Sequence, residues 1–271
     1  MPASRTFLSS LDRNTATYTS PVGSVTTKAY IRPRACVSVQ GPDAADLLQR
    51  IVSNDVLAAD SCEALILTAK GRVIAPLLVW RRDADDFLLL TEPELGEIVR
   101  AHLLRMRIAS KCAIELEEHS SAVVLGGTGG IPTRDYGVPA VEVLDEIADA
   151  EAADEELERL RILARTPRWG REIDEGILPA EAGLDERAVS FTKGCYPGQE
   201  PLSRLQHRGH VNRGLRVLEV EEARQADEVY EGERVVGRVT SAVPGLALAY
   251  VRVEVPDGAE LTVSGRPARI H

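Results

Sequence analysis

One octapeptide stands out in this 271-residue sequence: Lys193-Gly194-Cys195-Tyr196-Pro197-Gly198-Gln199-Glu200. The glycine before Cys195 allows backbone angles that other residues avoid, and it leaves space beside the sulfur. Pro197-Gly198 fits a tight turn, because proline fixes its own φ and glycine accepts the conformation that follows. Beyond the turn, Leu202 and Leu205 indicate a short helix, in which Pro201 is tolerated only in the first turn.

The chemistry of this segment centres on Cys195. A thiol just ahead of a helix start, with Lys193 close in sequence, is placed where a thiolate is stabilised. We therefore expect a readily ionised, partly exposed and reactive sulfur. The alternative is a packing role, because free cysteines are among the most buried residues and usually behave as small hydrophobes. Core packing is the expectation for the other three cysteines, which lie in or beside apolar strand runs: Cys36, Cys62 and Cys112.

Downstream of the octapeptide, residues 201–218 contain no Asp or Glu but six basic side chains. These are Arg204, His207, Arg208, His210, Arg213 and Arg216. Such a strip can hold an anionic group such as a carboxylate tail, since arginine offers bidentate pairing. Equally, it can be a solvated basic face that balances the acidic helix around Glu155. His207 and His210 lack a third ligand at suitable spacing, so we expect no zinc site there.

The pattern of apolar residues divides the chain into three expected units. Residues 1–118 are predicted to form an α+β unit with an N-terminal extension, in which strands mixed with two helices build an antiparallel sheet. Residues 119–213 are predicted to form a second α+β unit that carries the octapeptide. In residues 214–271, short Val- and Leu-rich runs separated by turn residues predict a small antiparallel β-barrel or sandwich.

The composition bounds the class of protein. Hydrophobic residues make up 44% and charged residues 27%, as in ordinary soluble globular proteins. A net charge of −10 argues against nucleic-acid binding, which needs a surplus of Lys and Arg. No stretch approaches the roughly 20 apolar residues of a membrane span, and the start does not read as a signal peptide. Four scattered cysteines fit a reducing compartment, so we expect a cytoplasmic protein that contacts neither nucleic acid nor membrane.

The octapeptide also supports a resemblance to a known family. Lys-Gly-Cys-Tyr-x-Gly-Gln-Glu followed by Ala/Ser-Arg is the signature of the YgfZ-type proteins, and it is intact here through Ser203-Arg204. Weaker pieces resemble this family and its relative, the glycine-cleavage T-protein, in the same order along the chain. These pieces are residues 39–43, 54–56, 71–73, 161–162, 167–170, 178–181, 183–184, 237–241 and 247–251. The resemblance therefore covers most of the chain from about Ala35 onward.

The resemblance implies a fold, a ligand and a role. The implied fold has two interlocked ferredoxin-like α+β units around a central cavity, plus the C-terminal barrel. The implied ligand is tetrahydrofolate in that cavity, and the implied role is assembly or repair of clusters in iron–sulfur client proteins, with Cys195 as the functional thiol. The other signature positions are Lys193, Gly194, Tyr196, Gly198, Gln199, Glu200 and Arg204. Arg161, Arg208 and Arg213 are candidate ligand-binding residues, and no permanently bound metal is expected, since a cluster generally needs several thiolates.

The chain departs from aminomethyl-transferring T-proteins at two carboxylates. Where those proteins carry an aspartate against the folate's reactive nitrogen, this chain has Ala75, followed by Pro76; where they carry a pterin-holding glutamate, it has Leu163. Without these groups nothing is in place to orient or protonate the folate amine, so we predict that glycine-cleavage activity is absent. Two alternatives stay open: a tetrahydrofolate-dependent aminomethyl- or methyltransferase, and a non-catalytic binding module whose cysteine only packs.

Overall fold

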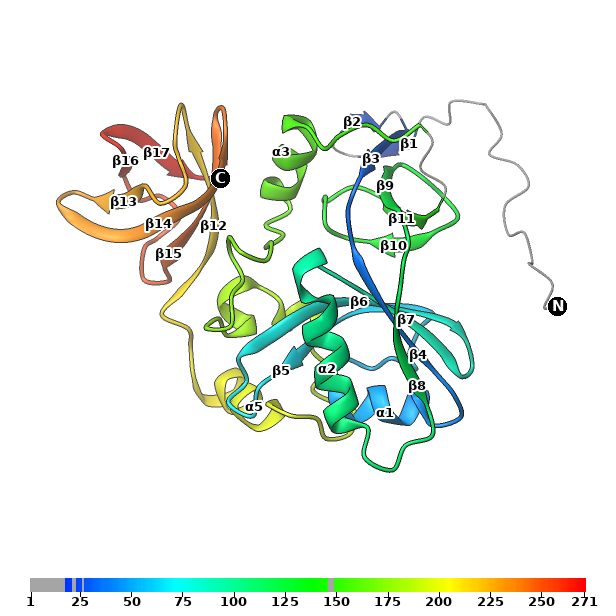
Figure 1. Cartoon of the computed structure of the whole chain (residues 1–271). Helices are drawn as coiled ribbons and strands as arrows, with labels where there is room; N and C mark the ends of the chain where they lie inside the picture. The colour runs from blue at the N-terminus through cyan, green and yellow to red at the C-terminus, as the bar shows by residue number, and fades with distance from the viewer. Residues whose placement is uncertain (1–17, 21–22, 26, 146–148) are drawn as a thin grey trace.

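The computed structural model of the chain describes residues 18–20, 23–25, 27–145 and 149–271. Two antiparallel sheets and a closed C-terminal barrel, joined by short helices, confirm the expected α+β class (Figure 1). A separate hairpin pairs β1 (Tyr18–Ser20) with β2 (Gly23–Val25). None of the helices in the described residues combines the length and the apolar character that crossing a membrane requires.

The first sheet has five strands in the order β5-β6-β7-β4-β8. Their bounds are β4 (Ala35–Gln40), β5 (Ser61–Leu67), β6 (Val73–Asp83), β7 (Asp86–Thr91) and β8 (Ala113–Glu117). Helix α1 (Ala44–Ile51) and helix α2 (Gly96–Met106), which follows the short η1 (Pro93–Leu95), pack on this sheet. Val37 and Val39 lie two residues apart, so both face the helices and join Leu47 and Val99 in one core.

The second sheet includes a strand from the beginning of the chain. Its order is β10-β11-β9-β3, with β3 (Lys28–Ile31), β9 (Ser121–Leu125), β10 (Ile131–Thr133) and β11 (Ala140–Leu144). β3 pairs with β9, so that Lys28 lies opposite Leu125. The chain then crosses through residues 32–34 into β4 of the first sheet. This crossing interlocks the two units.

Four short helices lead from the second sheet to the barrel. They are α3 (Glu155–Leu163), η2 (Pro179–Ala182), α4 (Asp185–Ala188) and α5 (Gln199–Arg208). Around the barrel the order is β12 (Arg213–Val220), β15 (Leu246–Arg252), β14 (Arg234–Val243), β13 (Glu228–Glu231), β16 (Leu261–Val263) and β17 (Arg266–Ile270). One apolar cluster joins Leu248 of the barrel to Leu67 of the first sheet and to Tyr196 of the octapeptide. The octapeptide is thereby held where the barrel meets the first sheet.

Candidate functional site

The turn of the octapeptide is pressed against the tip of the β5–β6 hairpin. Gly198 has φ +84°, a conformation that favours glycine, and it precedes the first residue of α5. A Cβ at this position would lie 2.6 Å from the carbonyl oxygen of Thr68 and 3.0 Å from the Cα of Gly71. Two backbone segments therefore meet where only a glycine fits. Leu202, buried one turn into α5, extends the contact.

Lys193 anchors the other end of the octapeptide. Its ammonium donates hydrogen bonds to the carbonyl oxygens of Val52 at 2.7 Å and Asn54 at 2.8 Å, just beyond α1. It also lies 5.3 Å from the ring centroid of Tyr196. Burial lowers the pKa of Lys193 to about 8. The structure thus gives Lys193 an anchoring contact, where the sequence suggested a partner for the Cys195 thiolate.

Cys195 lies between these two anchors and is exposed to solvent. Gly194 beside it is exposed as well, and an added Cβ there would meet nothing within 4 Å. On the other side Tyr196 is buried, and its hydroxyl donates to the carbonyl of Ser190 at 3.1 Å. The expected exposure of the sulfur is therefore present, on a segment whose flanking residues are fixed.

The remaining cysteines differ from Cys195. Cys36 is 2% exposed, while Cys62 and Cys112 are half-buried, and all four cysteines are free thiols. Burial raises the pKa of Cys36 and of Cys62 to about 11. A buried thiol that resists ionisation is a poor nucleophile. Among the four, Cys195 is the one that solvent reaches freely.

The basic strip of residues 201–218 is divided among several contacts. Arg204 pairs with Glu200 one turn earlier on α5, and Gln199 begins that helix. Arg213 donates to Glu181 at 3.0 Å and stacks 4.7 Å from the centroid of the Tyr250 ring. Arg216 pairs with Asp257 at 2.8 Å. Arg208 and His207 are exposed on α5 and line a surface groove.

Arg161 is committed to structural contacts. Its side chain is 2% exposed and donates to Glu158 at 2.7 Å, to Glu172 at 3.2 Å and to the carbonyl of Thr166 at 2.6 Å. Glu172 in turn accepts a hydrogen bond from Ser241 of β14 at 2.7 Å. This network ties α3 to the barrel. The three arginines proposed from the sequence as ligand-binding residues, Arg161, Arg208 and Arg213, do not line the central cavity.

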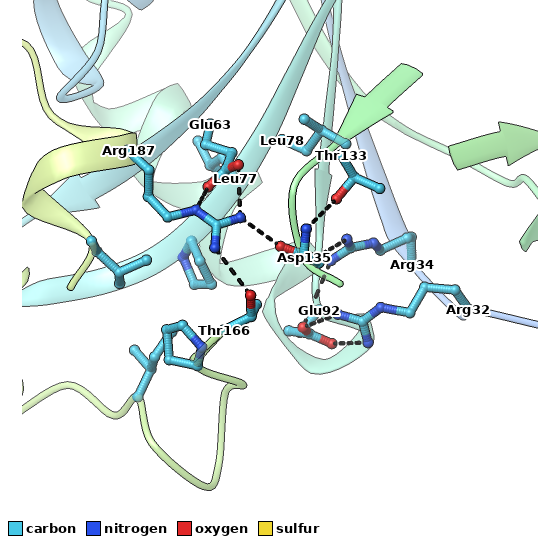
Figure 2. Close-up of a pocket in the computed structure, with 14 residues that line it drawn as sticks. Arg32, Arg34, Glu63, Leu77, Leu78, Glu92, Thr133, Asp135, Thr166 and Arg187 are labelled. Carbon is cyan, nitrogen blue, oxygen red and sulfur yellow. Dashed lines mark hydrogen bonds and ion pairs between the residues drawn. The ribbon is translucent and has the colours of Figure 1, made fainter. Parts of the chain in front are cut away.

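The central cavity lies between the two sheets and α4 (Figure 2). Its volume is about 60 Å³. Its charged lining comes from the β3–β4 crossing, from β5, from the end of β7, from the loop after β10 and from α4. In that order the residues are Arg32, Arg34, Glu63, Glu92, Asp135 and Arg187. Pro76, Leu77 and Leu78 of β6 supply an apolar wall.

The charged residues that line this cavity form ion pairs with one another. Arg187 donates to Glu63 at 2.8 Å and to Asp135 at 2.8 Å, and Arg32 donates to Glu92 at 2.7 Å. Arg34 forms a two-pronged pair with Glu142 of β11 and approaches Glu92 and Asp135 at 3.6 and 3.9 Å. Burial would raise the pKa of Glu92, but Arg32 and Arg34 outweigh it and hold that pKa below its usual range. Glu92 is thus kept ionised, as the partner of two arginines.

One donor in this network remains free. Nε of Arg32 is buried and has no hydrogen-bond partner among the described residues, although both of its terminal nitrogens bond to Glu92. A buried donor without a partner is costly and commonly marks a place for a ligand or a water molecule. A cavity of 60 Å³ takes water, whereas pockets for drug-sized ligands run from about 300 to 1,000 Å³. As it stands, this cavity does not accommodate a folate.

The charged residues of this cavity were not predicted from the sequence as site residues. The available signal was a charged residue inside or directly after an apolar run: Glu63 in β5, Glu92 after β7 and Glu142 in β11. A charge in such a place is rarely left without a partner. What the sequence did not indicate was which arginine would meet which carboxylate, since Arg34 and Glu142 lie 108 residues apart.

The two departures from the T-protein pattern can now be placed. Ala75 is fully buried under the helices of the first unit, and its neighbour Pro76 lines the cavity. Of these two positions, 76 lines the cavity and 75 does not, and no carboxylate stands at either. Leu163 is 38% exposed at the end of α3 and does not line the cavity.

Known proteins resemble the C-terminal barrel by itself and also most of the chain. Residues 212–271 match the family model described as CAF17, C-terminal beta-barrel domain. A Pyricularia oryzae protein named iron-sulfur cluster assembly factor IBA57 homolog, mitochondrial, is 26% identical over 292 residues, which cover 88% of this chain and 74% of that protein. The tRNA-modifying protein YgfZ of Edwardsiella ictaluri is 25% identical over 223 residues, or 66% of each chain.

A solved structure extends the likeness to the fold as a whole. The glycine cleavage system aminomethyltransferase T from Bartonella henselae superposes with a TM-score of 0.77, covering 90% of this chain and 85% of that one, at 17% sequence identity. At that identity the likeness concerns the fold alone. Together with the interlocked sheets, the closed barrel and the relatives named above, it shows that this chain has a YgfZ-type, aminomethyltransferase-like fold.

Proposed function

We propose that this protein is an accessory factor in iron–sulfur cluster assembly or repair, with Cys195 as its working thiol. The names of its relatives support a role in iron–sulfur cluster assembly or tRNA modification. The observation that carries the finer proposal is an exposed cysteine held on a fixed turn, between the Lys193 anchor and the Gly198 contact. A cytoplasmic location remains a prediction.

In this proposal the cluster is held by a client protein. Clusters are usually held by several cysteine thiolates. In this chain Cys36 lies on β4, Cys62 on β5 and Cys112 just before β8, and all three are at least half-buried in the first unit. Cys195 therefore acts as a single thiol that a client can reach. Because both ends of its segment are fixed, meeting a client costs little ordering entropy.

Complementation tests the thiol role. In cells that lack this protein, Cys195→Ser should fail to restore the activity of iron–sulfur enzymes. Cys112→Ser, which changes a half-buried thiol of the first unit, should restore it as well as wild type does. Full restoration by Cys195→Ser would remove the thiol from the mechanism.

Alkylation of the native protein tests the same proposal by a different route. Cys195 should react with a maleimide at neutral pH while the protein is folded, and Cys36 should react only after unfolding, since it is 2% exposed. Mass spectrometry of digested protein assigns the modified site. A native Cys195 that resists the reagent as Cys36 does would favour the packing role.

Tetrahydrofolate binding is a separate part of the proposal. The fold supports it, because the resemblance found in the sequence implies that a protein of this fold binds tetrahydrofolate in its central cavity. Because that cavity holds only about 60 Å³, binding requires the ion pairs around Arg32, Arg34 and Arg187 to separate. A titration that follows melting temperature and tryptophan fluorescence tests this. No change at saturating tetrahydrofolate would end the folate part and leave the thiol role standing.

No specific observation favours a one-carbon transferase over the accessory role. Such an enzyme needs a group that moves a proton at the reacting amine. The cavity carboxylates Glu63, Glu92 and Asp135 each pair with an arginine. Formaldehyde release or methylene transfer that depends on tetrahydrofolate would nevertheless promote this alternative.

A further inference from the structure

A surface groove runs between α5 and the tip of the β5–β6 hairpin. It measures about 720 Å³, and its apolar floor includes Leu178, Pro201 and Leu205. We call it the α5 groove. Its walls carry four cations, Lys70, Arg72, Arg204 and Arg208, against one anion, Glu200, with His207 beside them. The groove thus bears a net charge of +3 in a protein whose net charge is −10.

Most of this positive charge is not neutralised within the chain. Arg204 pairs with Glu200, but no carboxylate of the described residues lies within ion-pair distance of Lys70, Arg72 or Arg208. Arg72 donates to the carbonyl of Gly176, which orients its guanidinium without cancelling the charge. Lys70, Arg72 and Arg208 are all exposed. Three free cations over an apolar floor match a segment that offers both carboxylates and apolar side chains.

The chemistry of the groove favours a protein segment over RNA. Single-stranded RNA is usually held by aromatic side chains on which bases stack, and the groove lining contains no Phe, Tyr or Trp. RNA also extends beyond a groove of this size, where it meets the acidic surface of the rest of the chain. Asp174 and Glu175, both exposed, immediately precede the Gly176 that Arg72 contacts. A short acidic segment avoids this repulsion.

The groove also lies close to the proposed working thiol. Glu200 follows Cys195 by five residues, so their Cα atoms are separated by at most about 18 Å. The hairpin that forms one wall is the same one on which Gly198 packs. A partner that contacts Glu200 in the groove therefore comes within about 18 Å of the Cys195 Cα atom.

We propose that the α5 groove docks an acidic, partly apolar segment of the client protein and so presents the client to Cys195. This inference rests on the proposed function, and it adds the surface and the kind of partner. Docking on a charged groove raises the association rate and weakens as salt increases, since the exposed charges are screened.

A peptide probe tests the docking directly. The probe is a fluorescent peptide of alternating Glu and Leu, as long as α5 at ten residues, and its binding is followed by anisotropy at low and high salt. The groove variant is Lys70→Glu with Arg208→Glu. The matched control is Lys111→Glu with Arg269→Glu, which makes the same charge change at two exposed positions outside the groove. We expect the groove variant to weaken binding about tenfold, as loss of two charge pairs implies, and the control to leave it nearly unchanged.

Two results would overturn the proposal. Equal weakening in the groove variant and the control would show that the peptide senses only overall charge. Binding of a ten-nucleotide RNA with no binding of the peptide would assign the groove to nucleic acid. As a test of position, bound peptide should slow alkylation of Cys195 by a bulky maleimide in wild type and not in the groove variant.

Complementation separates this inference from the proposed function. If Cys195→Ser restores iron–sulfur enzyme activity, the thiol role fails whatever the groove does. If Cys195→Ser fails to restore it and the groove variant restores it fully, the thiol role stands and the docking inference fails. We expect both variants to be deficient, with the groove variant retaining wild-type alkylation of Cys195 in the absence of peptide.

Discussion

Substitution of Gly198 by alanine gives the sharpest test of how the signature turn is held. Two separate costs arise at this position. The first is the left-handed backbone at φ +84°, which costs a residue with a Cβ about 1–2 kcal/mol. The second is contact, because the new methyl group would lie 2.6 Å from the Thr68 carbonyl oxygen and 3.0 Å from the Cα of Gly71. Both neighbours are backbone atoms, so neither can rotate away.

Gly183 provides the matched control for the first cost. Its φ is +68°, and an added Cβ would meet nothing within 4 Å. Gly183→Ala should therefore lose about 1–2 kcal/mol of unfolding free energy from backbone strain alone. Gly198→Ala should lose this plus about 1–3 kcal/mol for overpacking. The difference between the two variants isolates the contact between the turn and the hairpin.

Urea unfolding of the three proteins measures this difference. The midpoints should fall in the order wild type, Gly183→Ala, Gly198→Ala, with similar slopes so that the shifts report stability. Equal losses of unfolding free energy in the two variants would refute the reasoning, because the contact between the Gly198 turn and the hairpin would then contribute nothing to the cost of the added methyl group. A larger loss in Gly183→Ala would refute it as well.

Three further substitutions test the electrostatics. Burial lowers the pKa of Lys193 to about 8 in the folded state, so the free energy of unfolding should rise with pH between about 8 and 10.5. Lys193→Met should remove about 1–2 kcal/mol of this pH-dependent rise, after allowance for the partial exposure of the side chain. Burial alone would lower the pKa of His119, but two carboxylates beside its ring raise it above 6.5. The ion pairs of protonated His119 therefore stabilise the fold fully below that pH, and this stabilisation is lost as pH rises. His119→Asn should thus have a lower free energy of unfolding than wild type in acid, and the plots of unfolding free energy against pH should converge for the two proteins at alkaline pH. Glu63→Gln leaves the Arg187 guanidinium short of a partner and should cost about 3 kcal/mol in urea unfolding, whereas Glu97→Gln, at an exposed pair, should cost less than about 1 kcal/mol.

Local patterns predicted the parts of the fold that depend on neighbouring residues. The helix after Pro197-Gly198 and the antiparallel strands of residues 214–271 follow from turn chemistry and apolar spacing, and both are present. Among the strands that the pattern did not predict, two short ones contain a proline, Pro132 in β10 and Pro267 in β17. Proline argues against a strand in a sequence pattern, and it is accommodated here in strands of three and five residues.

For the candidate site, too, some features follow from the local sequence and others depend on distant residues. The exposure of Cys195 follows from adjacent glycines and the turn, which the sequence displays. The contacts of Lys193 do not, because its acceptors lie about 140 residues earlier in the chain, at Val52 and Asn54. The cavity depends wholly on such distant pairs, as between Arg187 and Glu63. A residue type and its local pattern indicate that a charge needs a partner, but only the assembled sheets show which partner it finds.

The crossing at residues 32–34 bears on how the molecule assembles during synthesis. All five strands of the first sheet lie within residues 35–117, so that sheet can close as soon as this stretch has emerged. β3 is made earlier, yet its partner β9 begins only at Ser121. β3 therefore has no β9 to pair with until every strand of the first sheet has been synthesised. Such late, long-range pairing slows folding and leaves a strand edge open to other chains in the meantime.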